Sequence, residues 1–108
     1  MRNIICLVCL SLAATSVRAD PVTEALAGKT LVAPGQNITT HADGTLTGKV
    51  GENLDIDLIG TWEIRDGQWC RTLSQPAAAA GSACQDITLG DGVVTIVGSR
   101  GPVEFAIQ

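Results

Sequence analysis

Two arginines are the residues most able to bind a ligand. Arg71 comes two residues after Trp69, and Arg100 lies in a short Ser-Arg-Gly segment. A guanidinium beside an aromatic ring can hold a carboxylate or phosphate through a fork of parallel hydrogen bonds. Trp69, Arg71 and Arg100 therefore form a candidate site for a small anionic ligand. In the alternative interpretation, Arg71 pairs with a local acid such as Asp86 and covers the indole edge with its aliphatic stem.

Three acids form a second candidate site. Asp55 and Asp57 are two residues apart, so on a strand they share one face, and Glu63 could lie beside them on a neighbouring strand. Paired carboxylates can bind calcium or perform acid–base chemistry. The segment lacks the third acid and the glycine of a calcium loop, so a solvated outer face is favoured.

The motifs of several enzyme classes are missing from the sequence. The nearest match to a dinucleotide-binding glycine motif, Gly90-Asp91-Gly92, lacks the third glycine and continues into a β-branched run. There is no phosphate-binding loop and no Gly-x-Ser-x-Gly, and His41 is the only histidine. We therefore expect no catalytic residues, no metal and no cofactor.

The N-terminus has the pattern of a secretory signal peptide. Arg2 precedes an apolar run from Ile4 to Ala14, and small residues at Val17 and Ala19 fit a cleavage site. Eleven helical residues span roughly 16 Å, which is too short for a hydrocarbon core of about 30 Å. The prediction is a signal peptide over 1–19, a single mature domain over 20–108 without a membrane anchor, and a periplasmic or secreted location.

The mature chain is acidic. Residues 20–108 keep five of the seven basic residues and all eleven acidic ones, an excess of six negative charges. Without a basic stripe, and with only Trp62, Trp69 and Phe105 as aromatics, binding to nucleic acid or to an anionic membrane surface is disfavoured.

Removal of the signal peptide leaves only Cys70 and Cys84. In an exported chain an even pair predicts a disulfide, and zinc or redox roles are disfavoured by the spacing and by the single histidine. A bridge that closes about fifteen residues is worth about 3 kcal/mol in the chain-entropy model.

Turn residues every eight to ten positions predict a small antiparallel meander. Asp20 and Pro21 favour a short helix from Asp20 to Ala27 that ends at Gly28 and turns Val22, Leu26 and Ala25 inward. Strands are expected over 30–33, 37–41, 45–50, 54–59, 61–65, 68–73, 84–89, 93–97 and 103–107. The fold class is thus mainly β, a curved sheet or a small barrel with one N-terminal helix and one disulfide.

Alternation assigns faces to several of these strands. It places Leu54, Ile56 and Leu58 on a dry face, Trp62 and Ile64 on another, and Val103, Phe105 and Ile107 together. The alanine-rich segment from Ser74 to Ser82 is predicted to be a surface loop. It is interpreted as a spacer, with a mobile binding loop as the alternative.

A resemblance is carried by Gly60-Thr61-Trp62, by Asp66-Gly67-Gln68-Trp69-Cys70-Arg71 and by Cys84-Gln85. With the flanking glycine motifs, this series resembles small exported alphaproteobacterial proteins that often carry the label dihydrodipicolinate reductase. The resemblance implies a periplasmic or secreted domain with a Cys70–Cys84 bridge, and it does not supply an activity. A true reductase of that name has a Rossmann domain and a His-rich catalytic segment, which this sequence lacks.

Three classes of function follow from these observations. We favour a binding or interaction module, with a small anionic ligand or a cell-envelope protein as its partner. One alternative is an enzyme, either a nicotinamide-dependent reductase or a hydrolase that uses the acidic face. The other is a structural or accessory protein of the cell envelope.

Overall fold

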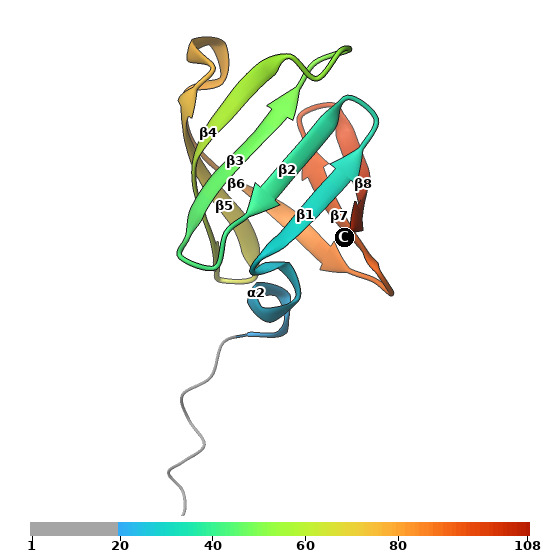
Figure 1. The fold of residues 1–108 in the computed structure, drawn as a ribbon. Helices are drawn as coiled ribbons and strands as arrows, with labels where there is room; N and C mark the ends of the chain where they lie inside the picture. The colour runs from blue at the N-terminus through green and yellow to red at the C-terminus, as the bar shows by residue number, and fades with distance from the viewer. Residues whose placement is uncertain (1–19) are drawn as a thin grey trace, which may run out of the picture.

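The protein folds as a closed eight-stranded barrel. The computed structural model describes residues 20–108, and the expected signal peptide at 1–19 lies outside the described residues. Each strand pairs antiparallel with the strands before and after it, and β8 returns to β1 (Figure 1). The predicted fold class is confirmed, with the barrel in place of an open sheet. The strands are β1 (Lys29–Ala33), β2 (Gln36–Thr40), β3 (Thr45–Val50), β4 (Ile56–Arg65), β5 (Gln68–Gln75), β6 (Gly81–Leu89), β7 (Val93–Gly98) and β8 (Gly101–Ile107).

A short helix, α2 (Pro21–Leu26), covers one end of the barrel (Figure 1). Asp20 is its N-cap, as predicted, because its carboxylate accepts hydrogen bonds from the backbone N–H groups of Val22 and Thr23, both at 2.9 Å. The Thr23 bond lowers the pKa of Asp20 below its ordinary value. Leu26 is fully buried, and Val22 packs against the core.

The helix is joined to the barrel by a buried threonine. Thr40 is completely buried on β2, and its hydroxyl donates to the Leu26 carbonyl oxygen at 2.5 Å. The Lys29 carbonyl oxygen lies 3.1 Å from the same hydroxyl. Because a buried hydroxyl is costly without a partner, these bonds fix where the helix ends and β1 begins.

The barrel interior is filled by every second residue of each strand. Trp62 and Ile64 face inward while Glu63 and Arg65 are exposed, as alternation predicts. Trp62 and Trp69 stack with ring centroids 5.9 Å apart, and the Trp62 indole donates to the His41 carbonyl at 2.9 Å. The core cluster comprises Leu26, Leu31, Ala33, Ile38, Leu46, Leu58, Trp62, Trp69, Leu73, Val94, Ile96 and Phe105.

Two expected strands are one strand in the structure. The prediction ended a strand at Ile59 because Gly60 looked like a turn residue, whereas β4 runs through it. A Cβ on Gly60 would lie 2.0 Å from the Thr72 carbonyl oxygen, so the glycine allows β5 to approach closely beside a register shift. Leu54 was also misplaced: it lies in the preceding turn with φ 54°, and Leu54 and Ile56 are exposed.

The loop between the cysteines is shorter than predicted. Ser74 and Gln75 continue β5, and Gly81 and Ser82 begin β6, so the connection is reduced to 76–80. A short 3₁₀ turn, η2 (Ala77–Ala79), forms most of it. The alternation of β5 and β6 thus continues past both cysteines, which lengthens this hairpin at the end of the barrel away from α2 (Figure 1).

Candidate functional site

The candidate site begins with an arginine that points into the barrel. On β5, Trp69, Arg71 and Leu73 occupy alternate positions, and Trp69 and Leu73 are buried in the core. Arg71 is therefore on the inward face, where it is half-buried. All other Lys, Arg, Asp and Glu side chains of residues 20–108 are exposed. The sequence predicted an arginine beside an indole, and the fold places Arg71 at the wall of a cavity that is partly open to solvent.

That cavity has a volume of about 280 Å³ and lies toward the end of the barrel away from α2. Its wall is mostly apolar, with Arg71 as its only charged residue and the amides of Gln36 and Gln85 as the other polar side chains. Pro76 and Ala79 reach it from the β5–β6 connection. The remaining wall residues are Ile38, Leu46, Val50, Leu58, Trp69, Leu73, Ile96, Gly98, Val103 and Phe105.

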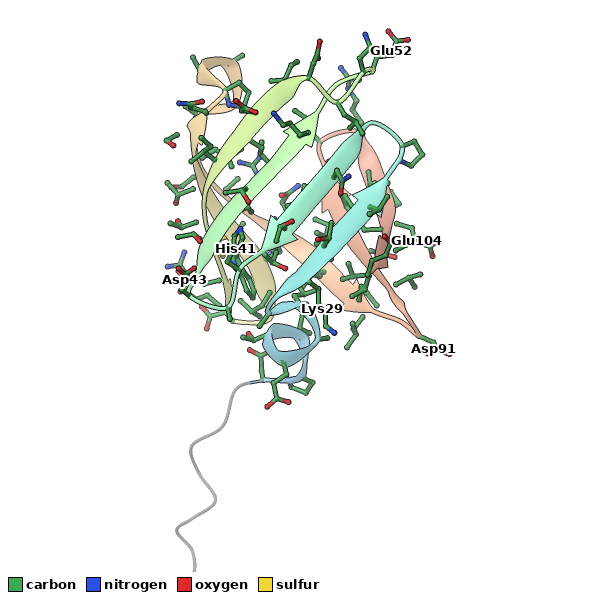
Figure 2. The ribbon with its side chains drawn as sticks, in the orientation of Figure 1. Lys29, His41, Asp43, Glu52, Asp91 and Glu104 are labelled. Carbon is green, nitrogen blue, oxygen red and sulfur yellow. A yellow bond between two sulfur atoms is a disulfide. The ribbon has the colours of Figure 1, made fainter. Side chains whose placement is uncertain are left out.

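No carboxylate of the described residues neutralises Arg71. Its guanidinium makes no hydrogen bond or ion pair with any side chain between residues 20 and 108. Asp86, the partner considered from the sequence, instead accepts from the Gln68 amide at 3.0 Å. Acidic side chains such as Glu52, Asp91 and Glu104 lie on turns or on the outer surface (Figure 2). Arg71 therefore gives the cavity a positive wall with no opposing charge.

The third predicted residue lies near this site and outside its wall. Arg100 is exposed on the turn that joins β7 to β8. Gly98 and Val103, on either side of that turn, both line the cavity. The structure thus brings Trp69 and Arg71 together and leaves Arg100 at the rim of the same end of the barrel.

Gln36 and Gln85 were missed by the sequence reasoning. Gln85 is paired with Trp69 across the β5–β6 ladder. It lies on the inward face of β6 together with Ala83 and Ile87. Its amide Nε2 donates to the Val97 carbonyl oxygen at 3.1 Å. The alternation of the strand predicted over 84–89 places Gln85 on the same face as Ile87, and this signal was not used, whereas Gln36 precedes the strand predicted over 37–41.

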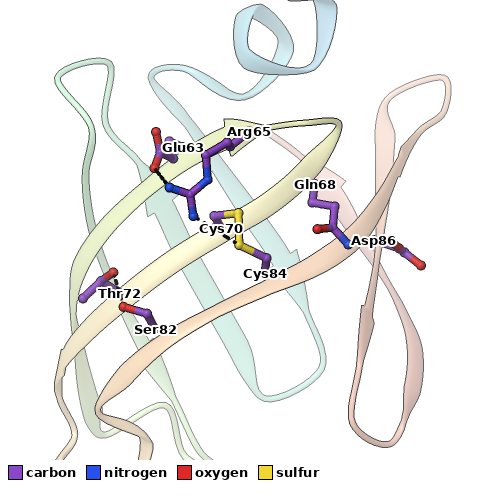
Figure 3. The surroundings of a disulfide bond; sticks show 8 residues. All are labelled: Glu63, Arg65, Gln68, Cys70, Thr72, Ser82, Cys84 and Asp86. Carbon is purple, nitrogen blue, oxygen red and sulfur yellow. Dashed lines mark hydrogen bonds and ion pairs between the residues drawn. A yellow bond between two sulfur atoms is a disulfide. The ribbon is translucent and has the colours of Figure 1, made fainter.

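The disulfide lies across the outer side of the same two strands. Cys70 on β5 and Cys84 on β6 are directly paired in the ladder and bridged, as predicted (Figure 3). An Arg65 guanidinium N–H donates to the Cys84 Sγ at 3.5 Å, and Arg65 also pairs with Glu63 at 3.3 Å. The Thr72 and Ser82 hydroxyls lie 2.7 Å apart. These cross-strand links hold β5 and β6 together behind Arg71.

The acidic candidates do not come together as a site. Asp57 is paired with Lys49, and Glu63 is paired with Arg65. Among the residues that the structure describes, no group of three His, Cys, Asp or Glu side chains is placed to hold a metal ion. The exposed face expected for Asp55 and Asp57 is present, and both carboxylates are on it.

His41 and Asp43 occupy the turn before β3, near α2 (Figure 2). The His41 Nε2 lies 2.7 Å from the Thr47 hydroxyl. The side-chain and backbone bonds from Thr45 hold the pKa of Asp43 below its ordinary value. Both residues stabilise this turn and lie outside the cavity wall.

Comparison with known proteins does not add to this description. No protein-family model, no curated protein and no solved structure matches the chain. Between residues 20 and 108 there is no helix with the length and apolar character needed to span a membrane.

Proposed function

We propose that the protein is a binding module that holds a small amphipathic anion inside the barrel. The ligand has a carboxylate that Arg71 binds and a compact apolar body that contacts the cavity wall. One observation carries this proposal: Arg71 is the single charged residue between positions 20 and 108 that is not exposed, and it faces an apolar cavity with no acid in its wall.

The charge balance supports an anion over a neutral or cationic ligand. Keeping a guanidinium at an apolar wall is unfavourable unless an opposite charge or hydrogen bonds compensate it. A carboxylate can satisfy two of the guanidinium N–H groups at once. The Gln36 amide and the second N–H of the Gln85 amide, also on the cavity wall, supply further hydrogen-bond donors.

The cavity size and lining favour a small ligand. A volume of about 280 Å³ is near the lower end of the ~300–1,000 Å³ that is typical of ligand pockets. The indole of Trp69 and the ring of Phe105 offer flat contact surfaces. Medium-chain fatty acids and arylalkanoates are therefore the ligand classes we expect, ahead of long lipids.

Location outside the cytoplasm is part of the proposal. A disulfide between two adjacent strands persists in an oxidising compartment. The apolar segment before Asp20 has the composition of a cleaved leader. Expression of the full chain followed by intact-mass analysis of the exported material tests this: a chain that starts at Asp20 and lacks free thiols is expected, and an uncleaved cytosolic chain would contradict it.

The binding experiment uses octanoate and phenylacetate, with their uncharged amides as matched ligands. Binding is measured by calorimetry and by fluorescence of the stacked Trp62–Trp69 pair. We expect the carboxylates to bind at least tenfold more tightly than the amides, and Arg71→Gln to remove that preference. Arg65→Gln, which changes an exposed arginine on the outer surface, is the control. Failure of both carboxylates to bind, or equal affinities in the native protein and Arg71→Gln, would refute the proposal.

A further inference from the structure

Strand β6 of the barrel is longer than its neighbour β7. The β6–β7 ladder contains only the pairs Ile87↔Ile96, Thr88↔Thr95 and Leu89↔Val94. β7 ends at Gly98, and among the described residues the main-chain ladder of the first part of β6, from Gly81 to Asp86, is with β5 alone. The Gln85 side chain still reaches β7, where it donates to the Val97 carbonyl oxygen at 3.1 Å. Figure 3 shows β6 running along β5 from Ser82 to Asp86, with the β7–β8 hairpin beyond Asp86. The part before Gln85, from Gly81 to Cys84, is a free strand edge.

The free edge lacks the features that usually block strand addition. Natural edges carry lysine, proline or a bulge that prevents another chain from pairing. Between Gly81 and Gln85 there is none of these, and Asp86 is the only charged residue of the stretch. The Gly90 N–H donates to the Val93 carbonyl oxygen, so the main-chain groups of Gly90 point toward β7. Because alternate residues of a regular strand point their main-chain groups to the same side, those of Ser82 and Cys84 point toward the free side of β6.

The same edge is held in a fixed conformation. The Cys70–Cys84 bridge and the Thr72–Ser82 hydroxyl pair both tie it to β5. A partner strand would therefore meet an edge that is already ordered, which lowers the entropic cost of association.

The cavity reaches this edge. Gln85 on β6 and Gly98 on β7 lie just past the last residue pair of the β6–β7 ladder, and both line the cavity. Arg71 is paired with Ala83, so it lies one strand away from the free side of β6. A chain that lies along the edge can therefore place one end at the cavity wall beside Arg71.

We propose that the anion is the C-terminal carboxylate of an extended peptide that adds as a strand to the free edge of β6. This inference rests on the proposed function, since it assigns the carboxylate of the same site to a peptide. β6 runs from Gly81 toward Gln85, where the cavity reaches the edge, so the added strand is parallel to β6. Its terminal carboxylate binds Arg71, and its last side chain, small and apolar, enters the cavity. Main-chain bonds supply affinity, and the terminal residue supplies specificity.

The test uses a pool of acetylated hexapeptides of alternating Thr and Val, varied at the last residue, as free acids and as C-terminal amides. Affinities for the full exported protein are measured beside that for octanoate. We expect the best free-acid peptide to bind at least tenfold more tightly than both its amide and octanoate. Arg71→Gln removes the preference for the free acid.

The variant Ser82→Pro tests the edge itself. It removes one N–H from the free side of β6 and leaves the β5–β6 ladder bonds in place, and circular dichroism verifies that the barrel is folded. We expect at least a tenfold loss of peptide affinity with octanoate binding unchanged. Ser82→Ala also lacks the hydroxyl but keeps the N–H, and it retains most of the peptide affinity.

The outcomes separate this inference from the proposed function. If octanoate binds in an Arg71-dependent manner and no hexapeptide binds more tightly, the peptide inference is wrong and the proposed function stands. If peptides bind equally as acids and amides, or if Ser82→Pro binds them as Ser82→Ala does, the inference is also wrong. If neither octanoate nor any free-acid peptide binds, both proposals fail.

Discussion

The two ends of the barrel share one alternation pattern and differ in what fills them. Near α2, Leu26, Leu31 and Val94 are completely buried, and the buried Thr40 is satisfied by backbone carbonyls. At the other end the inward positions include Arg71 and Gly98, and the wall surrounds a cavity. The buried side chains near α2 therefore stabilise the fold, whereas the other end leaves space for a ligand.

Exposed apolar side chains occur at both ends of the barrel. Leu54, Ile56 and Val97, at the end away from α2, are 38%, 44% and 41% exposed, and Leu89, beside the β6–β7 turn, is 37% exposed. None of these side chains lines the cavity, so the two ends differ in their interiors and not in their exposed apolar residues.

The largest effect is expected from truncation of the packed end. Leu31→Ala removes a fully buried side chain that does not line the cavity, so the free energy of unfolding should fall by about 2–5 kcal/mol. Val103→Ala changes a half-buried residue that already borders the cavity, and it should cost clearly less. Urea denaturation of both variants measures the difference. Equal losses would show that the two ends are packed alike.

A smaller effect is expected from the helix cap at the packed end. Asp20→Ala removes the acceptor of the Val22 and Thr23 N–H groups and should cost about 0.5–2 kcal/mol at pH 7. The folded pKa of Asp20 is lowered from 3.8, so its contribution is present above that value and is lost as the pH falls through the folded pKa.

The pH dependence of the cap is checked by urea denaturation between pH 7 and pH 2. The difference between native protein and Asp20→Ala should shrink below pH 3.8. Asp20→Asn keeps a capping oxygen and does not titrate, so its stability relative to Asp20→Ala should not depend on the Asp20 carboxyl. A difference that persists unchanged at pH 2 would contradict the role of the ionised carboxylate.

The sequence predicted the packed end better than the hollow end. Asp20 and Pro21 define the helix start locally, and the alternation through Trp62 and Ile64 identifies the core face without knowledge of neighbours. Gly60 could not be assigned from the sequence, because its reason is the approach of Thr72 from β5.

The cavity was harder to predict for the same physical reason. Trp69 and Arg71 were singled out by residue type, but that Arg71 lacks an acid partner depends on where Gln68 and Asp86 lie in the folded chain. Arg100 has the same chemistry and lies outside the cavity wall. Residue type finds the candidates, and closure of the barrel decides which of them faces the cavity.

The smallest effect on stability is expected at the hollow end, from Arg71→Met. This substitution replaces the charged group at the cavity wall with an apolar side chain of similar length. Removing a charge that has no partner between residues 20 and 108 relieves its desolvation, so the free energy of unfolding should change by less than about 1 kcal/mol or rise. Binding of octanoate and phenylacetate should be lost in the same variant. Thermal denaturation and calorimetry on one preparation measure both quantities, and a large loss of stability would mean that Arg71 is a structural residue whose place at the cavity wall serves the fold.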